Sequence, residues 1–110
     1  ENAMLTTSDE TMDLLNEIGH PNLGLEYDAF HMHVTERNMA ETVQKYLPHI
    51  GNIQIADVPG RHEPGTGSID YDAFLGALDK MGYSNWVACE YTPVGSTIDG
   101  LGWLRKWLEA

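Results

Sequence analysis

Three oxygen-bearing side chains stand at matching places in three apolar runs of the chain. They are Asp28, Gln54 and Glu90, each near the carboxyl end of a predicted β-strand. Carboxylate and amide oxygens suit Mg²⁺ or Mn²⁺ better than Zn²⁺, because the set has no sulfur and no certain imidazole. An ion held there would polarise a carbonyl and its neighbouring hydroxyl, and so acidify the C–H bond between them. We therefore expect a metal site, although each residue taken singly could be an ordinary polar group at a strand end.

Two basic side chains are expected near this set. His31 follows Asp28 by three residues in a predicted loop, where it would either hydrogen-bond a substrate oxygen or be an ordinary loop histidine. Arg61 lies in a loop rich in Gly and Pro. A guanidinium binds a carboxylate through two parallel hydrogen bonds, so Arg61 is a candidate substrate clamp. Its alternative is a surface pair with Glu63.

The elements that would position these residues alternate along the chain. The predicted strands cover residues 23–28, 52–57 and 86–91. The predicted helices run from Thr7 to Ile18, from Asn38 to the residue before Pro48, from Asp70 to Gly82, and from Ser96 or Thr97 to Leu108. This order, α-β-α-β-α-β-α, implies parallel strands joined by right-handed crossovers. No G-x-G-x-x-G follows a strand, so the dinucleotide-binding version of such a fold lacks its signature.

Each predicted strand has one apolar face and one face that carries polar groups. Side chains alternate along a strand, so Ile53 and Ile55 share a face opposite Gln54, and Val87 and Cys89 share a face opposite Glu90. A helix over the polar face would bury charges without partners. These faces are therefore expected to line the lumen of a barrel, whose chemistry lies at the carboxyl ends of its strands. Cys89 is expected to be a core residue on the helix side.

Composition excludes several classes of function. The chain has 110 residues, 42% hydrophobic and 21% charged, with a formal net charge of −11. Such an acidic domain repels phosphate backbones and anionic lipid, so neither nucleic acid nor a membrane is an expected partner. One cysteine and no secretory signal favour a cytoplasmic location. Residues 1–3 before Met4 are interpreted as a tag remnant, and residues 4–110 as the domain.

Four segments resemble the hydroxypyruvate isomerase family of xylose-isomerase-like TIM barrels. They are PNLGLEYDAFHM at residues 21–32, GNIQIAD at 51–57, PGRHEPGTG at 59–67 and CEY at 89–91. The resemblance implies that Asp28, Gln54 and Glu90 are metal ligands and that Glu90 is also catalytic. It further implies that His31 and Arg61 contact the substrate. The same family includes 2-oxo-tetronate isomerases, which these motifs do not separate.

The resemblance implies that the chain is the last three strands of an eight-stranded barrel. The expected reaction interconverts hydroxypyruvate and 2-hydroxy-3-oxopropanoate (tartronate semialdehyde) through an enediolate. A second catalytic glutamate, on the strand before the first helix, is absent from this chain. One alternative is a non-catalytic fragment that self-associates as a homo-oligomer, because its sheet edges are open. Another is a metal-dependent epimerase or endonuclease on the same barrel, the endonuclease being disfavoured by the negative charge.

Overall fold

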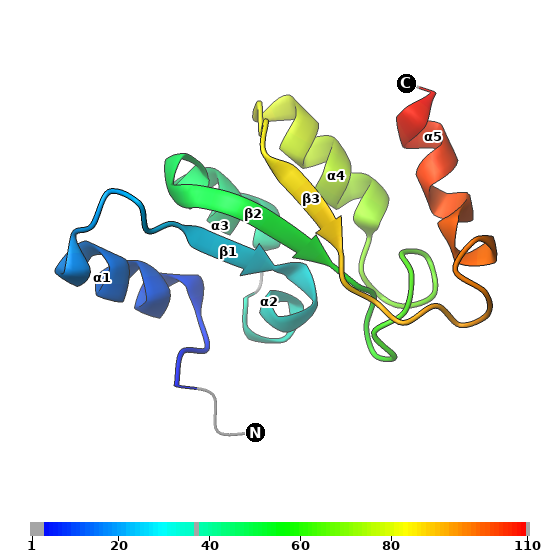
Figure 1. Cartoon of the computed structure of the whole chain (residues 1–110), viewed down its shortest axis with the longest axis horizontal. Helices are drawn as coiled ribbons and strands as arrows, with labels where there is room; N and C mark the ends of the chain where they lie inside the picture. Colours follow the sequence, from blue (N-terminus) through cyan, green and yellow to red (C-terminus); the bar gives the residue numbers. More distant parts are fainter. Residues whose placement is uncertain (1–3, 37, 110) are drawn as a thin grey trace.

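Three parallel strands form one sheet in the computed structural model, which describes residues 4–36 and 38–109 (Figure 1). The strands are β1 (Leu25–Asp28), β2 (Ile50–Ile55) and β3 (Trp86–Cys89), in the spatial order β1-β2-β3. The helices are α1 (Ser8–Ile18), α2 (Ala29–Thr35), α3 (Met39–Tyr46), α4 (Tyr71–Lys80) and α5 (Arg105–Leu108), with the 3₁₀ helices η1 (Leu47–His49) and η2 (Asp99–Leu104). The predicted tag remnant, residues 1–3, lies outside the described residues.

Local capping chemistry begins the longer helices where the sequence predicts. Thr7 and Glu10 form a reciprocal capping box at the start of α1. Asn38 accepts a hydrogen bond from the Glu41 amide at the start of α3, and Asp70 accepts one from the Ala73 amide at the start of α4. These predicted helix starts are confirmed.

Other element boundaries differ from the predictions. Helix α2 follows β1 directly, so the prediction that His31 lies in a loop is wrong. Residues 4–36 and 38–109 form five α-helices, where four were expected. The strands are also shorter or shifted, at Leu25–Asp28, Ile50–Ile55 and Trp86–Cys89 instead of 23–28, 52–57 and 86–91. The last helix begins as η2, in which Gly100 and Gly102 weaken the α-helical conformation.

The helices and the sheet enclose the core on one side only. Tyr27, Ile53 and Ile55 of the strands are almost fully buried and pack with Phe74 and Leu78 of α4. Helices α3 and α4 lie behind the sheet in Figure 1, while its other face carries no helix. The outer face includes the Trp86 side chain, which is 83% exposed. The apolar and polar strand faces are thus arranged as the alternation predicts, with an open face where a barrel lumen would be.

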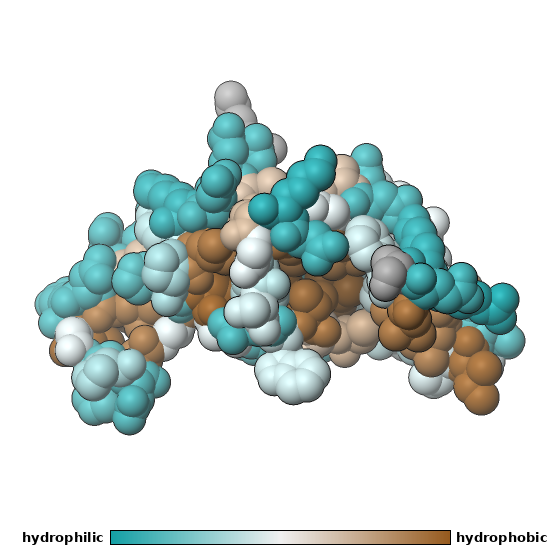
Figure 2. Space-filling model, turned by 90° about the horizontal axis from the view of Figure 1, so that it is seen from above, coloured by the Kyte–Doolittle hydropathy of each residue, from teal (hydrophilic) through white to brown (hydrophobic). Residues whose placement is uncertain are grey.

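Apolar side chains also reach the surface at the end of the molecule that carries α5 (Figure 2). Ile98 and Leu108 are largely exposed there. None of the helices in the described part of the chain combines the length and the apolar character of a membrane span.

Candidate active site at the carboxyl ends of the strands

The sheet register brings the three predicted metal ligands to one edge. Asp28 is the register partner of Gln54, and Gln54 is the partner of Ala88, two residues before Glu90. Glu90 follows the last residue of β3, and its amide donates to the Ile55 carbonyl at 3.0 Å. Asp28, Gln54 and Glu90 therefore stand at the carboxyl ends of adjacent strands. Their ligation of a common ion stays a prediction.

Asp28 both ends β1 and begins α2. Its Oδ1 accepts hydrogen bonds from the amides of Phe30 at 3.0 Å and His31 at 3.4 Å. These bonds cap the new helix and fix one carboxylate oxygen. The other oxygen, Oδ2, lies 3.7 Å from Nε2 of His31, whose side chain is 54% exposed. His31 is thus held beside Asp28 by the first turn of α2, within reach of solvent and ligand.

Arg61 lies between α2 and the segment that follows β3. Its Nη2 lies 3.6 Å from Oε1 of Glu90, and its Cζ lies 5.2 Å from the centroid of the Phe30 ring. Its backbone is left-handed, with φ at 59°. Glu63 instead accepts a hydrogen bond from the Val94 amide at 3.0 Å, so Arg61 does not adopt the alternative pairing with Glu63.

Two residues of the site were not predicted from the sequence. Phe30 contacts His31 edge to face at 5.2 Å and supports the Arg61 guanidinium by a cation–π contact. Its position between Asp28 and His31 is the signal that could have found it. Asp57, the acid directly before the Gly- and Pro-rich loop, is 1% exposed and organises that loop, as described below.

The donor set fits a hard divalent cation chemically. Two carboxylates and one amide supply only oxygen ligands, which Mg²⁺ and Mn²⁺ prefer. Among residues 4–36 and 38–109, no group of three His, Cys, Asp or Glu side chains is gathered for a metal, so the amide of Gln54 is needed to complete any set here. Cys89 lines two hollows: one of about 320 Å³ beside α4 and α5, with Leu78 and Trp103, and one of about 480 Å³ with Arg61 and Glu90. Cys89 is exposed there, which corrects its expected burial in the core.

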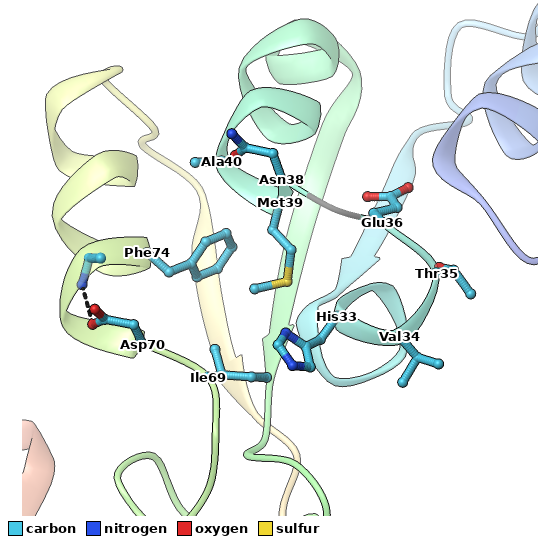
Figure 3. Close-up of a pocket in the computed structure, with 11 residues that line it drawn as sticks. His33, Val34, Thr35, Glu36, Asn38, Met39, Ala40, Ile69, Asp70 and Phe74 are labelled. Atoms are coloured by element: carbon cyan, nitrogen blue, oxygen red, sulfur yellow. Dashed lines mark hydrogen bonds between the residues drawn. The ribbon is translucent and has the colours of Figure 1, made fainter.

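A separate hollow of about 500 Å³ lies between α2, α3 and α4. Figure 3 shows His33, Met39 and Phe74 lining it, with Asp70 turned to its own helix. The oxygens of Asn38 and Asp70 on its rim cap α3 and α4. None of the predicted site residues lines this hollow, so the carboxyl edge of the sheet remains the candidate site.

Comparison with known proteins gives the family. The family model described as xylose isomerase-like TIM barrel matches residues 1–107. The chain belongs to this family, and its three parallel strands and covering helices are part of such a barrel.

Two named relatives match nearly the whole chain. It is 41% identical over 108 residues to 2-oxo-tetronate isomerase of Pectobacterium atrosepticum, covering 98% of this chain and 41% of that protein. It is 39% identical over 103 residues to hydroxypyruvate isomerase of Escherichia coli, covering 94% of this chain and 40% of that protein. The chain thus spans about two fifths of the length of these curated relatives.

Solved structures agree with the fold. The crystal structure of AP endonuclease, family 2 from Brucella melitensis superposes with a TM-score of 0.88 at 31% identity, over 94% of this chain and 40% of that one. The IOLI protein, solved with a binding zinc atom, superposes with a TM-score of 0.64 at 29% identity, over 81% of this chain and 36% of that one. Metal binding therefore occurs on this fold.

Proposed function

We propose that the protein carrying this chain is an isomerase of small hydroxy-keto acids, which interconverts hydroxypyruvate and 2-hydroxy-3-oxopropanoate. The observation that carries the proposal is the arrangement of Arg61 between Glu90 and Phe30 at the carboxyl edge of the sheet, where Asp28 also stands. This arrangement supports the proposal, because a guanidinium can bind a carboxylate and a neighbouring carboxylate can transfer a proton. The named relatives support the same chemistry, and 2-oxo-tetronate is the alternative substrate.

The proposed role of each site residue follows from the chemistry of its side chain. Arg61 binds the substrate carboxylate through its planar fork, and His31 donates to a substrate oxygen. Glu90 takes the proton from the hydroxyl-bearing carbon or, in the reverse direction, returns it, and the second carboxylate does the same at the former carbonyl carbon, with an enediolate between the two steps. The hydroxyl proton passes to the former carbonyl oxygen, so each proton removed is replaced. Asp28, Gln54 and Glu90 would hold Mg²⁺ or Mn²⁺, which supplies polarisation of the substrate's carbonyl and hydroxyl oxygens.

The full-length protein would supply what this chain lacks. We expect the second acid–base glutamate on the strand before α1, so that the two carboxylates act on opposite sides of the enediolate. The partners we expect remain a small hydroxy-keto acid and a second copy of the chain, with neither nucleic acid nor membrane, given the net charge of −11. A cytoplasmic location stays a prediction from the single cysteine.

The test uses the full-length protein with hydroxypyruvate and with 2-oxo-tetronate as substrates. We expect turnover of one or both with Mg²⁺ or Mn²⁺ added, and loss of turnover after chelation that either ion restores. Glu90→Gln should lower kcat by about 10²–10⁴-fold, because the general acid–base group is lost. Glu109→Gln, a neutralised acid just after α5, is the matched control and should retain activity. Turnover of neither substrate, or full activity of Glu90→Gln, would refute the proposal.

A further inference from the structure

A buried carboxylate lies at the centre of the loop that follows β2. Asp57 is 1% exposed, and its two oxygens accept four backbone hydrogen bonds. Oδ1 accepts from the amides of Val58 at 2.9 Å and Ile69 at 3.1 Å, and Oδ2 accepts from the amides of Gly65 and Gly67, both at 2.9 Å. Hydrogen bonds to a carboxylate are stronger than those between neutral groups. The Asp57 side chain thus binds the backbone at the beginning, the middle and the end of residues 58–69.

The glycines of this loop allow the chain to approach that carboxylate. A Cβ atom on Gly67 would lie 1.9 Å from the Val58 carbonyl oxygen and 2.7 Å from Oδ1 of Asp57. Gly65 has φ at 97°, which side-chain-bearing residues rarely adopt. The spacing of the PGRHEPGTG run therefore fits the loop around Asp57.

The same residue fixes the backbone on both sides of Arg61. The Arg61 amide donates to the Asp57 carbonyl at 2.9 Å, and the Asp57 amide donates to the His62 carbonyl at 2.8 Å. The Arg61 carbonyl accepts from the Thr92 amide at 3.0 Å, which ties the loop to the segment that follows Glu90. These bonds fix the backbone at Arg61 and thereby the direction in which its side chain projects.

The ion pair itself is too weak to hold this arrangement. Arg61 and Glu90 are 3.6 Å apart, with side chains 40% and 52% exposed. Exposed pairs of this kind contribute little stability, because water and salt screen them. The backbone cradle around Asp57 is the stronger determinant of where the guanidinium lies.

We infer that Asp57 is a positioning residue: its buried carboxylate holds residues 58–69 in the conformation that presents Arg61 to the substrate carboxylate. The inference rests on the proposed function of Arg61. On this inference, the affinity for acidic substrates depends on Asp57 although its buried side chain does not itself bind them.

Hydrogen exchange and a double-mutant cycle on the full-length protein test this role. Asp57→Asn keeps the shape but replaces one acceptor oxygen with an NH₂ group, which cannot accept from the loop amides. We expect exchange in peptides spanning residues 58–69 to rise at least about tenfold, since these amides lose their acceptors. Asp13→Asn, the same change on the exposed surface of α1, should leave that exchange unchanged.

The kinetic arm measures whether Asp57 acts through Arg61. Asp57→Asn should raise KM for hydroxypyruvate about tenfold or more with little change in kcat, because binding of the carboxylate is what weakens. On an Arg61→Ala background, Asp57→Asn should add almost no further loss, since the group it positions is gone. Calorimetric titration with hydroxypyruvate gives the same cycle without turnover.

The outcomes separate the inference from the proposed reaction. Additive losses in the cycle, or unchanged exchange of residues 58–69 in Asp57→Asn, would overturn the role of Asp57 and leave the reaction standing. Absent turnover by the unsubstituted protein, with a non-additive binding cycle, would refute the reaction and support the role of Asp57.

Discussion

The guanidinium of Arg61 contacts side chains from the segments that follow two of the strands. Arg61 contacts the Phe30 ring, which follows β1, and the Glu90 carboxylate, which follows β3. Its fork and the Glu90 carboxylate are both partly exposed, so an incoming carboxylate can replace Glu90 at little cost. Replacement would also free Glu90 for proton transfer. Under the proposed function, substrate binding by Arg61 would therefore be coupled to release of Glu90.

Replacement of Arg61 by lysine tests the clamp at the residue scale. In the full-length protein, Arg61→Lys should weaken binding of a carboxylate substrate by about 1–3 kcal/mol, because the bidentate fork is lost while the charge remains. The measurement is kcat/KM toward hydroxypyruvate. Arg105→Lys at the start of α5 is the control and should change nothing. An unchanged kcat/KM in Arg61→Lys would remove Arg61 from the site.

Gly67 offers a second residue-scale prediction. Gly67→Ala should lower the free energy of unfolding by on the order of 2 kcal/mol or more, because the added Cβ would collide with the Val58 carbonyl. Gly95→Ala is the matched control, since a Cβ there meets nothing within 4 Å. Urea unfolding of both variants gives the comparison, and equal midpoints would contradict the packing described around Asp57.

The strand pattern was enough to predict that Asp28, Gln54 and Glu90 stand at the carboxyl ends of adjacent strands. A period of two decides which side chains of a strand share a face. This pattern was not enough to find Asp57. A loop has no period, and the role of Asp57 depends on amides that lie up to 12 residues away in the sequence. Phe30 escaped prediction for a related reason, since its contact with Arg61 joins segments that are brought together only by the sheet.

Element boundaries were predictable where a side chain caps its own helix. The side chains of Thr7, Asn38 and Asp70 each accept a hydrogen bond from the backbone amide three residues ahead, a local pattern that the sequence displays. Helix α2 was missed because Asp28 performs two roles, as the last residue of β1 and as the cap of the next helix.

The caps give a prediction at the scale of the element. Asn38→Ala should lower the free energy of unfolding by about 1 kcal/mol, because the Glu41 amide loses its acceptor at the start of α3. Gln44→Ala, an exposed position within the same helix, should have almost no effect. Chemical denaturation compares the two, and equal stabilities would show that the cap contributes nothing to this fold.

Buried tyrosines make the stability of the whole molecule depend on alkaline pH. Burial, together with the hydrogen bond from its hydroxyl to Glu36, raises the pKa of Tyr27 far above its ordinary value of 10.0. The unfolded chain therefore loses this proton near pH 10 while the folded chain keeps it, so stability is full below that pH and falls above it.

Tyr27→Phe tests this dependence. We expect the free energy of unfolding of the unsubstituted chain to fall as the pH rises above about 10, and the variant to show a shallower fall, because phenylalanine has no proton to lose. Burial also raises the pKa of Tyr71, so part of the slope should remain. A variant with the same slope as the unsubstituted chain would exclude Tyr27 as a source of the dependence.

The open sheet face leads to a prediction for the 110-residue chain by itself. Only one face of the three strands is covered by helices, and the edges of β1 and β3 have no partner strand among the described residues. Trp86 is 83% exposed on the uncovered face. Small domains already bury a modest fraction of their surface, so a second copy that covers this face should be favoured. We expect an oligomer by size-exclusion chromatography with light scattering.

Two variants decide whether the open face causes that association. Trp86→Ser should shift the chain toward monomer, because it removes the largest apolar group of the face. Val34→Ser, which removes a side chain 76% exposed on α2, should leave the oligomer intact. The oligomer should show little or no isomerase activity with Mg²⁺ or Mn²⁺, since loss of one acid–base group costs about 10²–10⁴-fold in rate. A monomer that isomerises hydroxypyruvate at ordinary enzyme rates would show that the active site is complete within these residues, and that neither the open face nor the missing glutamate limits it.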